Sequence, residues 1–486
     1  MLVGSNITSF ILQCKISMRT VCLVFSLLIT QLVGYGQNMQ STIQKAINSF
    51  EADDNMRYGI IAFEVVDSQT GKVVFSNNSN VGLPAASSQK VLTAITAFDL
   101  LGSNYTYKTD MAYTGTIDNG VLTGEVYLTF HGDPTLGSDR FAATKSSLVI
   151  KAITDQLLLL GIVDIKGKII LDGNSFPYQP MPGGWLWTDI GNYYGAGHWG
   201  INWHENQYDL ILKPGQKEGD PVTIVSTDPP LQTAPFVNFL TTGKQGSGDN
   251  AYIYLAPYSN TPFVTGTVPA GTNRFTISGS FANPANQFMA ALQTGLASAG
   301  IKGNVTSEVL DGSSAAVKRY VLPTPIYTWQ SPALAIIIGQ FLTKSVNLYG
   351  EALVKTIGRE NGADGSTENG LSVLFQHLQT AGIDSNAIRM VDGSGLSPQN
   401  RITAHAFVQA MQYARKKSWF NTFYNALPVY NGIRMKSGTI GGVKSFTGYV
   451  KSAAGTNYTF AFVVNNFTGK SGPVVQRMYQ VLNMLK

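Results

Sequence analysis

The chain has 486 residues, of which 44% are hydrophobic and only 13% are charged, and its formal net charge is +5. The charged share is about half of what soluble domains usually carry. No run of like charge occurs, so the composition argues against a nucleic-acid-binding protein.

The N-terminus is typical of an export signal. Two basic residues precede an apolar stretch over 21–33, and the small residues Gly34 and Gly36 follow it. The stretch is shorter than the about 20 apolar residues that a membrane span needs. We therefore expect residues 1–36 to be a signal peptide of an exported, periplasmic protein with no integral membrane span in the mature chain. An uncleaved anchor and a start at Met18 remain alternatives.

The first part of the mature chain combines helices with a hairpin. Apolar residues at helical spacing predict a short helix over 38–57. Strand-forming runs on either side of turn residues 67–72 predict a β-hairpin over 58–75. A helical pattern then runs from Ser87 to Leu101 and ends before a glycine.

The middle of the chain has a different pattern of predicted secondary structure. Between about 103 and 317, short strand-like runs alternate with Gly, Pro, Asn and Ser turns, and helical patterns occur near 146–160 and 285–299. Four helical segments follow this block. The chain then ends with a predicted hairpin over 446–464 and a helix near 473–485.

These elements predict an α/β (α+β) protein with a discontinuous main domain. If the terminal strands pair, residues 37–102 and 318–486 form one catalytic domain. The β-rich region at 103–317 would then be an insertion. Its many short strands and two helical segments suggest two subdomains.

The sequence implies no metal and no cofactor. Both cysteines, Cys14 and Cys22, lie in the predicted leader, so the mature chain would have no disulfide and no thiolate. The five histidines are scattered without metal-ligand spacing, and no Gly-x-Ser-x-Gly elbow or glycine-rich phosphate loop occurs.

Three short patterns carry candidate chemistry, and they occur in the order Ser87-Ser88-Gln89-Lys90, Ser345-Val346-Asn347 and Lys436-Ser437-Gly438-Thr439. At a helix start, residues i and i+3 share one face, so an amine at Lys90 could accept the proton of the Ser87 hydroxyl. Lysine must be neutral for this, and moving its pKa from about 10.4 to about 7 requires roughly 4 to 5 kcal/mol. Burial and a second cation, for which Lys436 is a candidate, would supply that energy. Taken alone, Ser87 and Lys90 could equally lie at the exposed start of a surface helix.

The other two patterns are weak by themselves. Ser345 could simply cap a helix. The Lys-Ser-Gly pattern occurs at Lys436 and again at Lys470. In the first copy the next residue is Thr439, which has a backbone N–H to donate to an oxyanion, whereas Pro473 follows the second copy and has none. The first copy is therefore the better candidate.

Longer segments resemble the class C low-molecular-mass penicillin-binding proteins, the D-alanyl-D-alanine carboxypeptidase/endopeptidases. They are Leu83–Ala94, Gly132-Asp133-Pro134-Thr135-Leu136, Asp172-Gly173-Asn174, Gly184-Trp185-Leu186-Trp187-Thr188-Asp189 and Asp392-Gly393-Ser394-Gly395-Leu396-Ser397. The resemblance implies a penicillin-binding-protein/β-lactamase-like transpeptidase domain. In that fold an antiparallel sheet is flanked by helices, and a large β-rich insertion separates the first two motifs.

The resemblance also implies roles. Ser87 would be the acylated nucleophile and Lys90 its base. Ser345 would relay a proton to the leaving D-alanine, and Asn347 would bind the substrate's peptide group. Lys436 would support Ser345.

Binding roles follow in the same way. Together with Lys436, the segment Ser437, Gly438 and Thr439 would bind the substrate's terminal carboxylate. The backbone N–H groups of Ser87 and Thr439 would form the oxyanion hole. Asp189 would face the amine of a diaminopimelate side chain, although a capping role in its loop is an equal alternative.

The resemblance implies that peptidoglycan stem peptides and β-lactam antibiotics are the partners. The alternatives are a β-lactamase or D-amino-acid esterase of the same fold, or a catalytically silent cell-wall-binding protein. Two positions depart from the usual family pattern. Val346 stands where Asp is frequent, and Ser437 stands where Thr is usual.

Overall fold

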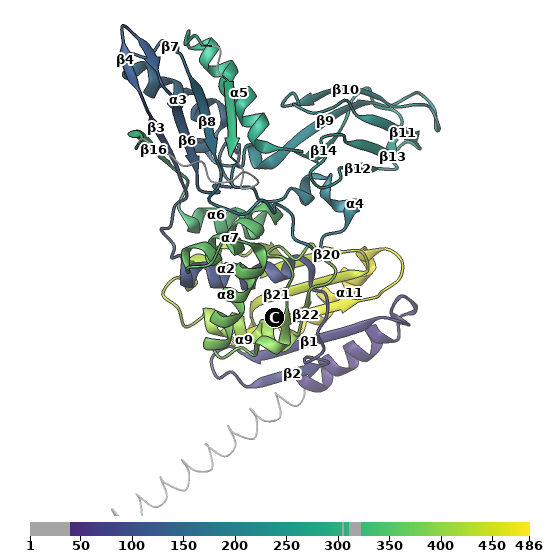
Figure 1. The fold of residues 1–486 in the computed structure, drawn as a ribbon. Helices are drawn as coiled ribbons and strands as arrows, with labels where there is room; N and C mark the ends of the chain where they lie inside the picture. The colour runs from purple at the N-terminus through teal and green to yellow at the C-terminus, as the bar shows by residue number, and fades with distance from the viewer. Residues whose placement is uncertain (1–38, 304–305, 311–321) are drawn as a thin grey trace, which may run out of the picture.

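The computed structural model describes residues 39–303, 306–310 and 322–486. The predicted signal peptide lies outside these residues. Figure 1 shows two lobes from the middle of the chain above a part that contains segments from both ends. Among the described helices, none is both long and apolar enough to cross a bilayer.

A six-stranded antiparallel sheet brings the two ends of the chain together. Its strand order is β19-β20-β21-β22-β1-β2, with bounds β1 (Ile60–Asp67), β2 (Val73–Asn77), β19 (Val429–Tyr430), β20 (Ile433–Ile440), β21 (Val443–Lys451) and β22 (Asn457–Asn465). Strand β1 pairs with β22 along its whole length, from Ile60 opposite Asn465 to Asp67 opposite Tyr458. The six central residues of β1 are buried, as expected of a strand covered on both faces.

Helices cover both faces of this sheet. One layer consists of α2 (Lys90–Leu100), α6 (Leu334–Thr343), α7 (Asn347–Glu360), α8 (Thr367–Thr380), α9 (Ala404–Ala414) and α10 (Phe420–Ala426). The other layer consists of the helical residues 39–51 and α11 (Ser471–Asn483). Side chains alternate between the layers, so Ala62 faces the first layer while Ile61 and Phe63 face the second.

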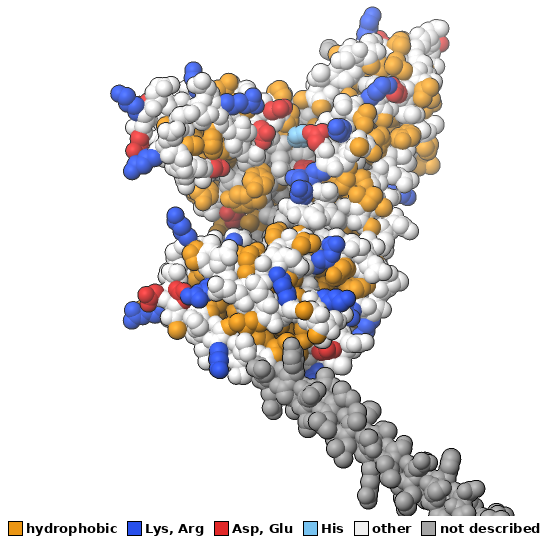
Figure 2. Space-filling model, turned by 180° about the vertical axis from the view of Figure 1, so that it is seen from behind, with side chains coloured by type: hydrophobic (Ala, Val, Ile, Leu, Met, Phe, Trp, Pro, Cys, Tyr) orange, Lys and Arg blue, Asp and Glu red, His pale blue; other side chains and the backbone are white. Residues whose placement is uncertain are grey.

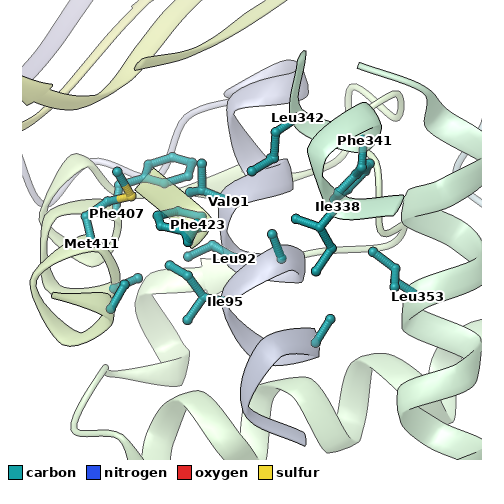
Figure 3. Packing of buried hydrophobic residues seen from close by; sticks show 14 of the residues in the cluster. Val91, Leu92, Ile95, Ile338, Phe341, Leu342, Leu353, Phe407, Met411 and Phe423 are labelled. Carbon is teal, nitrogen blue, oxygen red and sulfur yellow. The ribbon is translucent and has the colours of Figure 1, made fainter. Parts of the chain in front are cut away.

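Helix α2 lies at the centre of the first layer. Figure 3 shows Val91, Leu92 and Ile95 of α2 surrounded by apolar side chains from α6, α7, α9 and α10. All residues from Lys90 to Phe98 are buried. A helix that is apolar on nearly every side must be buried, so the fold carries Lys90 into the interior with it.

The middle of the chain forms the two upper lobes. One contains α3 (Ser146–Leu159), α5 (Pro284–Ser298) and the sheet β15-β8-β6-β3-β16, with bounds β3 (Lys108–Tyr113), β6 (Val126–Phe130), β8 (Lys168–Asp172), β15 (Thr306–Leu310) and β16 (Thr324–Gln330). Its tip carries β4 (Thr116–Asp118), β5 (Val121–Thr123) and β7 (Asp164–Ile165).

The other lobe contains α4 (Trp187–Ile190) and two three-stranded sheets. Their orders are β10-β9-β14 and β11-β13-β12, with bounds β9 (Gln207–Lys213), β10 (Thr223–Asp228), β11 (Val237–Gly243), β12 (Asn250–Tyr254), β13 (Phe263–Pro269) and β14 (Phe275–Ser280). Strands β17 (Ile388–Arg389) and β18 (Arg401–Ile402) form a separate two-stranded sheet, and their residues Ile388 and Ile402 belong to the apolar core of the first helical layer.

The antiparallel sheet flanked by helices agrees with the predicted fold class. The helix predicted from about Ser87 to Leu101 is present, but its first turn is of a different type, because the α-helix itself begins at Lys90. Residues Ala86–Gln89 instead form a 3₁₀ turn. In such a turn residues i and i+3 lie directly above one another, which places the Ser87 and Lys90 side chains on the same side.

Candidate active site

The first motif forms a serine–lysine pair. The Lys90 Nζ lies 2.9 Å from the Ser87 Oγ, within hydrogen-bond distance. The residue before the serine, Ala86, has a left-handed backbone with φ of 45°. Non-glycine residues adopt this conformation at an energetic cost, and it is often kept where a fold must aim a reactive group.

The amine of Lys90 is surrounded by acceptors and is not exposed. Its Nζ lies 2.7 Å from the Asn347 Oδ1 and 2.6 Å from the Ser394 carbonyl. Burial lowers the pKa of Lys90 well below its usual value, and the nearby charge of Lys436 lowers it further. The carboxylates of Asp392 and Glu351 oppose these effects on that pKa without overcoming them. A neutral Lys90 amine can accept a proton from Ser87.

The second motif lies in the short loop between α6 and α7. Ser345 has a left-handed backbone with φ of 59°, which turns the chain sharply before α7 begins at Asn347. The Asn347 amide accepts from Lys90 and donates to the Tyr194 carbonyl at 2.8 Å. Val346 is buried among the apolar side chains of the helical layer. The apolar residue at this position therefore anchors the loop by packing.

The third motif lies on β20. The Lys436 Nζ lies 3.0 Å from the Ser345 Oγ and 2.9 Å from the Ser437 carbonyl. Burial lowers the pKa of Lys436 to about 7. Strand β19 pairs with β20 only at Ile433 and Arg434, so no strand of the described residues pairs with the later part of β20 on the side opposite β21.

Gly438 allows β20 to approach the nucleophile turn. A Cβ at Gly438 would lie 2.2 Å from the Ala85 carbonyl oxygen and 2.9 Å from the Ser88 backbone nitrogen. Any larger residue would therefore push the strand away from Ser87.

Residues from all three motifs border one cleft of about 670 Å³. Ser87, Ser345, Asn347, Thr439 and Asp189 contribute to its lining. Lys90 and Lys436 are buried behind it, and Ser437 and Gly438 do not line it either, within the described part of the chain. Figure 2 shows the molecule hollowed between the two upper lobes and the part that contains the six-stranded sheet, with hydrophobic side chains gathered along the margin of one lobe. The three motifs, which are distant in the sequence, thus share one cavity.

Asp189 enters the cleft from the inserted lobe. It lies in the short helix α4, and its side chain is half-buried. Burial raises the pKa of Asp189, while a hydrogen bond with Tyr194 partly opposes that rise. A half-buried acid in a cleft is a candidate for binding a cationic group, because pairing with a cation would offset the loss of hydration.

The sequence did not single out Asp392 as a site residue, although it lies at the centre of a buried hydrogen-bond network. The Asp392 carboxylate accepts from five groups: the Trp185 indole, the Gln89 and Asn400 side-chain amides, and the backbone N–H groups of Gly395 and Ser397. This network holds the loop whose Ser394 carbonyl contacts Lys90. The only sequence signal was the glycine-rich segment around Asp392, which was noted as a family mark.

Glu351 was also missed, because it reads as an ordinary residue inside α7. It is fully buried, and its Oε2 accepts from the backbone N–H of Gly393 at 3.0 Å. Burial, followed by the charge of Asp392, raises the pKa of Glu351 to about 8. No pattern in the sequence indicates that this position of α7 faces the loop that contains Gly393 and Ser394.

The arrangement can support nucleophilic chemistry. It offers a hydroxyl in contact with an amine of lowered pKa, a second hydroxyl beside another buried lysine, and a strand with an open edge. In the described ranges, no group of three or more His, Cys, Asp or Glu side chains could hold a metal ion.

Comparisons with known proteins agree with the sequence motifs. The model of the D-Ala-D-Ala carboxypeptidase 3 (S13) family matches residues 43–483. The chain is 26% identical over 476 residues to a D-alanyl-D-alanine carboxypeptidase of Actinomadura sp. (strain R39), covering 89% of this chain and 82% of the relative. It is 23% identical over 460 residues to the D-alanyl-D-alanine carboxypeptidase DacB of Haemophilus influenzae. This match covers 88% of this chain and 90% of the relative.

Solved structures show the same fold. The crystal structure of penicillin binding protein 4 (dacB) from Haemophilus influenzae matches with a TM-score of 0.76 and 20% identity, covering 90% of this chain and 99% of that one. A structure of the same protein complexed with a β-lactam matches with a TM-score of 0.70 and 20% identity. This match covers 88% of this chain and 96% of that one. These matches confirm the predicted penicillin-binding-protein/β-lactamase-like fold.

Proposed function

The chain belongs to the D-Ala-D-Ala carboxypeptidase 3 (S13) family, and on that premise we propose that it is a serine D,D-peptidase that cleaves peptidoglycan stem peptides through an acyl-enzyme on Ser87. As a member of this family it is a serine-type peptidase with D-Ala-D-Ala carboxypeptidase function. The acyl-enzyme, the endopeptidase activity and the residue roles are the parts that we propose.

One observation carries the proposal. A lysine amine that is fully buried lies 2.9 Å from a hydroxyl that borders the cleft. Its pKa is lowered by burial, so Lys90 can be neutral and can take the hydroxyl proton at a pH below the usual 10.5 of lysine.

The proposed reaction follows from this geometry. The Ser87 Oγ attacks the carbonyl carbon of the penultimate D-alanine while its proton passes to Lys90. The backbone N–H groups of Ser87 and Thr439 stabilise the oxyanion. The C–N bond then breaks, and the departing amine takes a proton from the Ser345 hydroxyl, which regains one from the Lys436 ammonium that it contacts. Water then attacks the resulting ester and returns a proton to Lys436 through Ser345. The Lys90 ammonium gives its proton back to the Ser87 oxygen, which releases the shortened peptide and restores the starting state of both lysines.

Substrate binding is assigned to the groups around the cleft. The Asn347 amide would bind the substrate's peptide group. Lys436, with its ammonium next to Ser345, would bind the terminal carboxylate together with Ser437, Gly438 and Thr439. Ser437 keeps the hydroxyl of the usual threonine and lacks only a methyl group, so carboxylate binding should persist. β-Lactams would acylate the same Ser87.

The direct test uses two defined substrates. The purified protein is incubated with a pentapeptide ending in D-Ala-D-Ala and with a cross-linked peptide dimer, and products are followed by mass spectrometry. We expect release of D-alanine from the first and conversion of the second to monomers, because the cleft is open and a longer leaving group can fit. Failure to cleave either peptide, in a protein that is folded, would contradict the proposed function.

Asp189 is proposed to bind the side-chain amine of diaminopimelate in the stem peptide. Replacing Asp189 by Asn keeps its size and removes its charge. We expect kcat/KM to fall about tenfold to a hundredfold for peptides with a free side-chain amine, since charged hydrogen bonds contribute about 1.5–3 kcal/mol. Peptides with an acetylated amine should react equally well with both proteins. Equal losses for both peptides would assign Asp189 a purely structural role.

The sequence predicts residues 37–102 and 318–486 as the catalytic domain and 103–317 as the insertion, but β16 (Thr324–Gln330) pairs with β3 and belongs to the inserted lobe. We therefore propose the same division with the second boundary moved to about residue 331. The pairing of β1 with β22 and the separate apolar core of the inserted lobes support this division. The pattern at 1–36 supports export to the periplasm.

A further inference from the structure

One face of the small sheet β11-β13-β12 is apolar and exposed. Cross-strand partners lie on the same face of a sheet, and the pairing places six side chains outward in two rows, Tyr254 with Phe263 and Val237, and Tyr252 with Thr265 and Phe239. The opposite face carries Ile253, Val264 and Leu240, which are buried. The core of the lobe therefore packs on the opposite face, and on the outward face Trp187 of α4 contacts only the row of Tyr254 and Phe263, among the described residues. The outward rows are called the aromatic face below.

The aromatic face is unusually accessible for its composition. Phe239 is 63% exposed, Tyr252 is 45% exposed, and none of the six residues is charged. Trp187 of α4 extends the face, since its ring centre lies 4.9 Å from that of Tyr254 and 5.9 Å from that of Phe263 while the residue remains 51% exposed. A contiguous exposed apolar patch of this kind marks a binding surface.

The aromatic face is continuous with the catalytic cleft. Tyr252 and Tyr254 line the same cavity as Ser87 and Asp189. In Figure 2 hydrophobic side chains gather on this lobe beside the hollow that borders the proposed catalytic domain. A ligand bound at Ser87 that extends toward this lobe must therefore meet these rings.

We propose that the aromatic face binds sugar rings of the glycan strand to which the stem peptide is attached. The inference rests on the proposed function, which supplies a substrate that carries glycan. In a pentapeptide stem, four residues separate the scissile bond from the sugar, a reach of at most about 14 Å when extended. The sugar of a bound substrate is thus held close to the cleft, within reach of the adjoining lobe.

The chemistry of the aromatic face fits a neutral sugar polymer. One face of a pyranose ring presents C–H groups, which pack against the electron-rich face of an aromatic ring. The Tyr252 and Thr265 hydroxyls are available for sugar hydroxyls or acetamido groups, and three adjacent strands form a platform about 10 Å wide. A stem peptide carries carboxylates and amines, for which these six side chains offer no charged partner.

Binding is tested with a peptide-free probe. The full chain is titrated with a soluble N-acetylglucosamine hexamer and followed by isothermal calorimetry. We expect saturable binding, which Phe239→Ala weakens about tenfold, a change equivalent to about 1.4 kcal/mol, because the variant loses both the aromatic contact and the apolar area that it buries. Phe239→Tyr keeps the ring and should bind like the wild type. Tyr58→Ala is the matched control, because Tyr58 is 73% exposed on another part of the surface.

Catalysis supplies the second readout. We expect a higher kcat/KM for a disaccharide-pentapeptide than for the free pentapeptide, and Phe239→Ala should remove most of this preference without changing turnover of the free peptide. Trp187→Ala should weaken hexamer binding as well. Equal kcat/KM for both substrates together with no hexamer binding would overturn the proposal, as would self-association of the chain through this face. If the free pentapeptide is not cleaved, the proposed function fails, while hexamer binding still decides this inference.

Discussion

Replacing Ser87 by alanine is expected to abolish peptide cleavage and to prevent formation of a covalent adduct with penicillin. Among the described residues, only Ser87 has a hydroxyl that both borders the cleft and lies within 2.9 Å of the Lys90 amine. Loss of an attacking hydroxyl in serine hydrolases typically lowers kcat by about 10⁶. The adduct is measured as an increase in mass of the intact protein, and D-alanine release gives kcat.

Ser372→Ala serves as the control, because Ser372 is exposed on α8, away from the cleft. This variant should form the adduct at the wild-type rate. The lifetime of the wild-type adduct is also informative, since a long-lived ester is typical of a peptidase and rapid release is typical of a β-lactamase. A penicillin adduct that persists in Ser87→Ala would show that another group is the nucleophile.

Lys90→Met is expected to lower the rate of acylation by about 10³–10⁴ while the protein remains folded. Methionine has similar length and flexibility, so it can occupy the buried space of the Lys90 side chain, but it cannot accept the Ser87 proton. The rate is measured by stopped-flow with a chromogenic β-lactam. Lys344→Met, at an exposed lysine that lines the cleft, tests whether loss of a positive charge alone has this effect. A similar loss in both variants would argue against a proton-accepting role for Lys90.

The pH dependence gives an independent check on Lys90. Its folded-state pKa lies well below the usual 10.5, so acylation should rise with pH through that lowered value and not near 10.5. The change of stability with pH also has a defined sign. Between the two pKa values the unfolded chain binds a proton that the folded chain does not, so the free energy of unfolding increases with pH.

This stabilising contribution is complete above pH 10.5 and is lost as pH falls through the folded pKa of Lys90. Lys436, with a pKa of about 7, contributes a slope of the same sign from about pH 7 upward. Urea unfolding of the wild type and of Lys90→Met at several pH values measures the difference. We expect a smaller rise in stability with pH in the variant, and an unchanged slope would mean that Lys90 is not buried as a neutral amine.

The serine–lysine pair could be predicted because its chemistry is local. Three positions separate Ser87 from Lys90, and any helical turn brings such side chains close together. The hairpins at each end were also visible, since strand-forming runs flank turn residues. The helix from about Ser87 could be predicted as well, but not the type of its first turn, because hydrophobic periodicity does not distinguish a 3₁₀ turn from the first turn of an α-helix.

The partners of the Lys90 amine could not be predicted in the same way. Asn347 was singled out through its motif, but the Ser394 carbonyl carries no sequence signal as an acceptor, because any residue has a carbonyl. Glu351 and Asp392 reach the site only through the packing of α7 and the following loop against α2. The aromatic face was hidden too, because its members come from three strands whose register is set by pairing.

The amino-acid sequence by itself determined the reactive groups of this protein, their order, and the family to which they point, because residue types and short spacings are local properties of the chain. Only the tertiary structure decided that Lys90 is buried, that Lys436 contacts Ser345, and that rings of an inserted lobe border the same cleft. Burial and proximity arise when α2 is enclosed by other helices and β20 approaches the nucleophile turn. These are long-range contacts, and no local pattern specifies which distant segment will supply them.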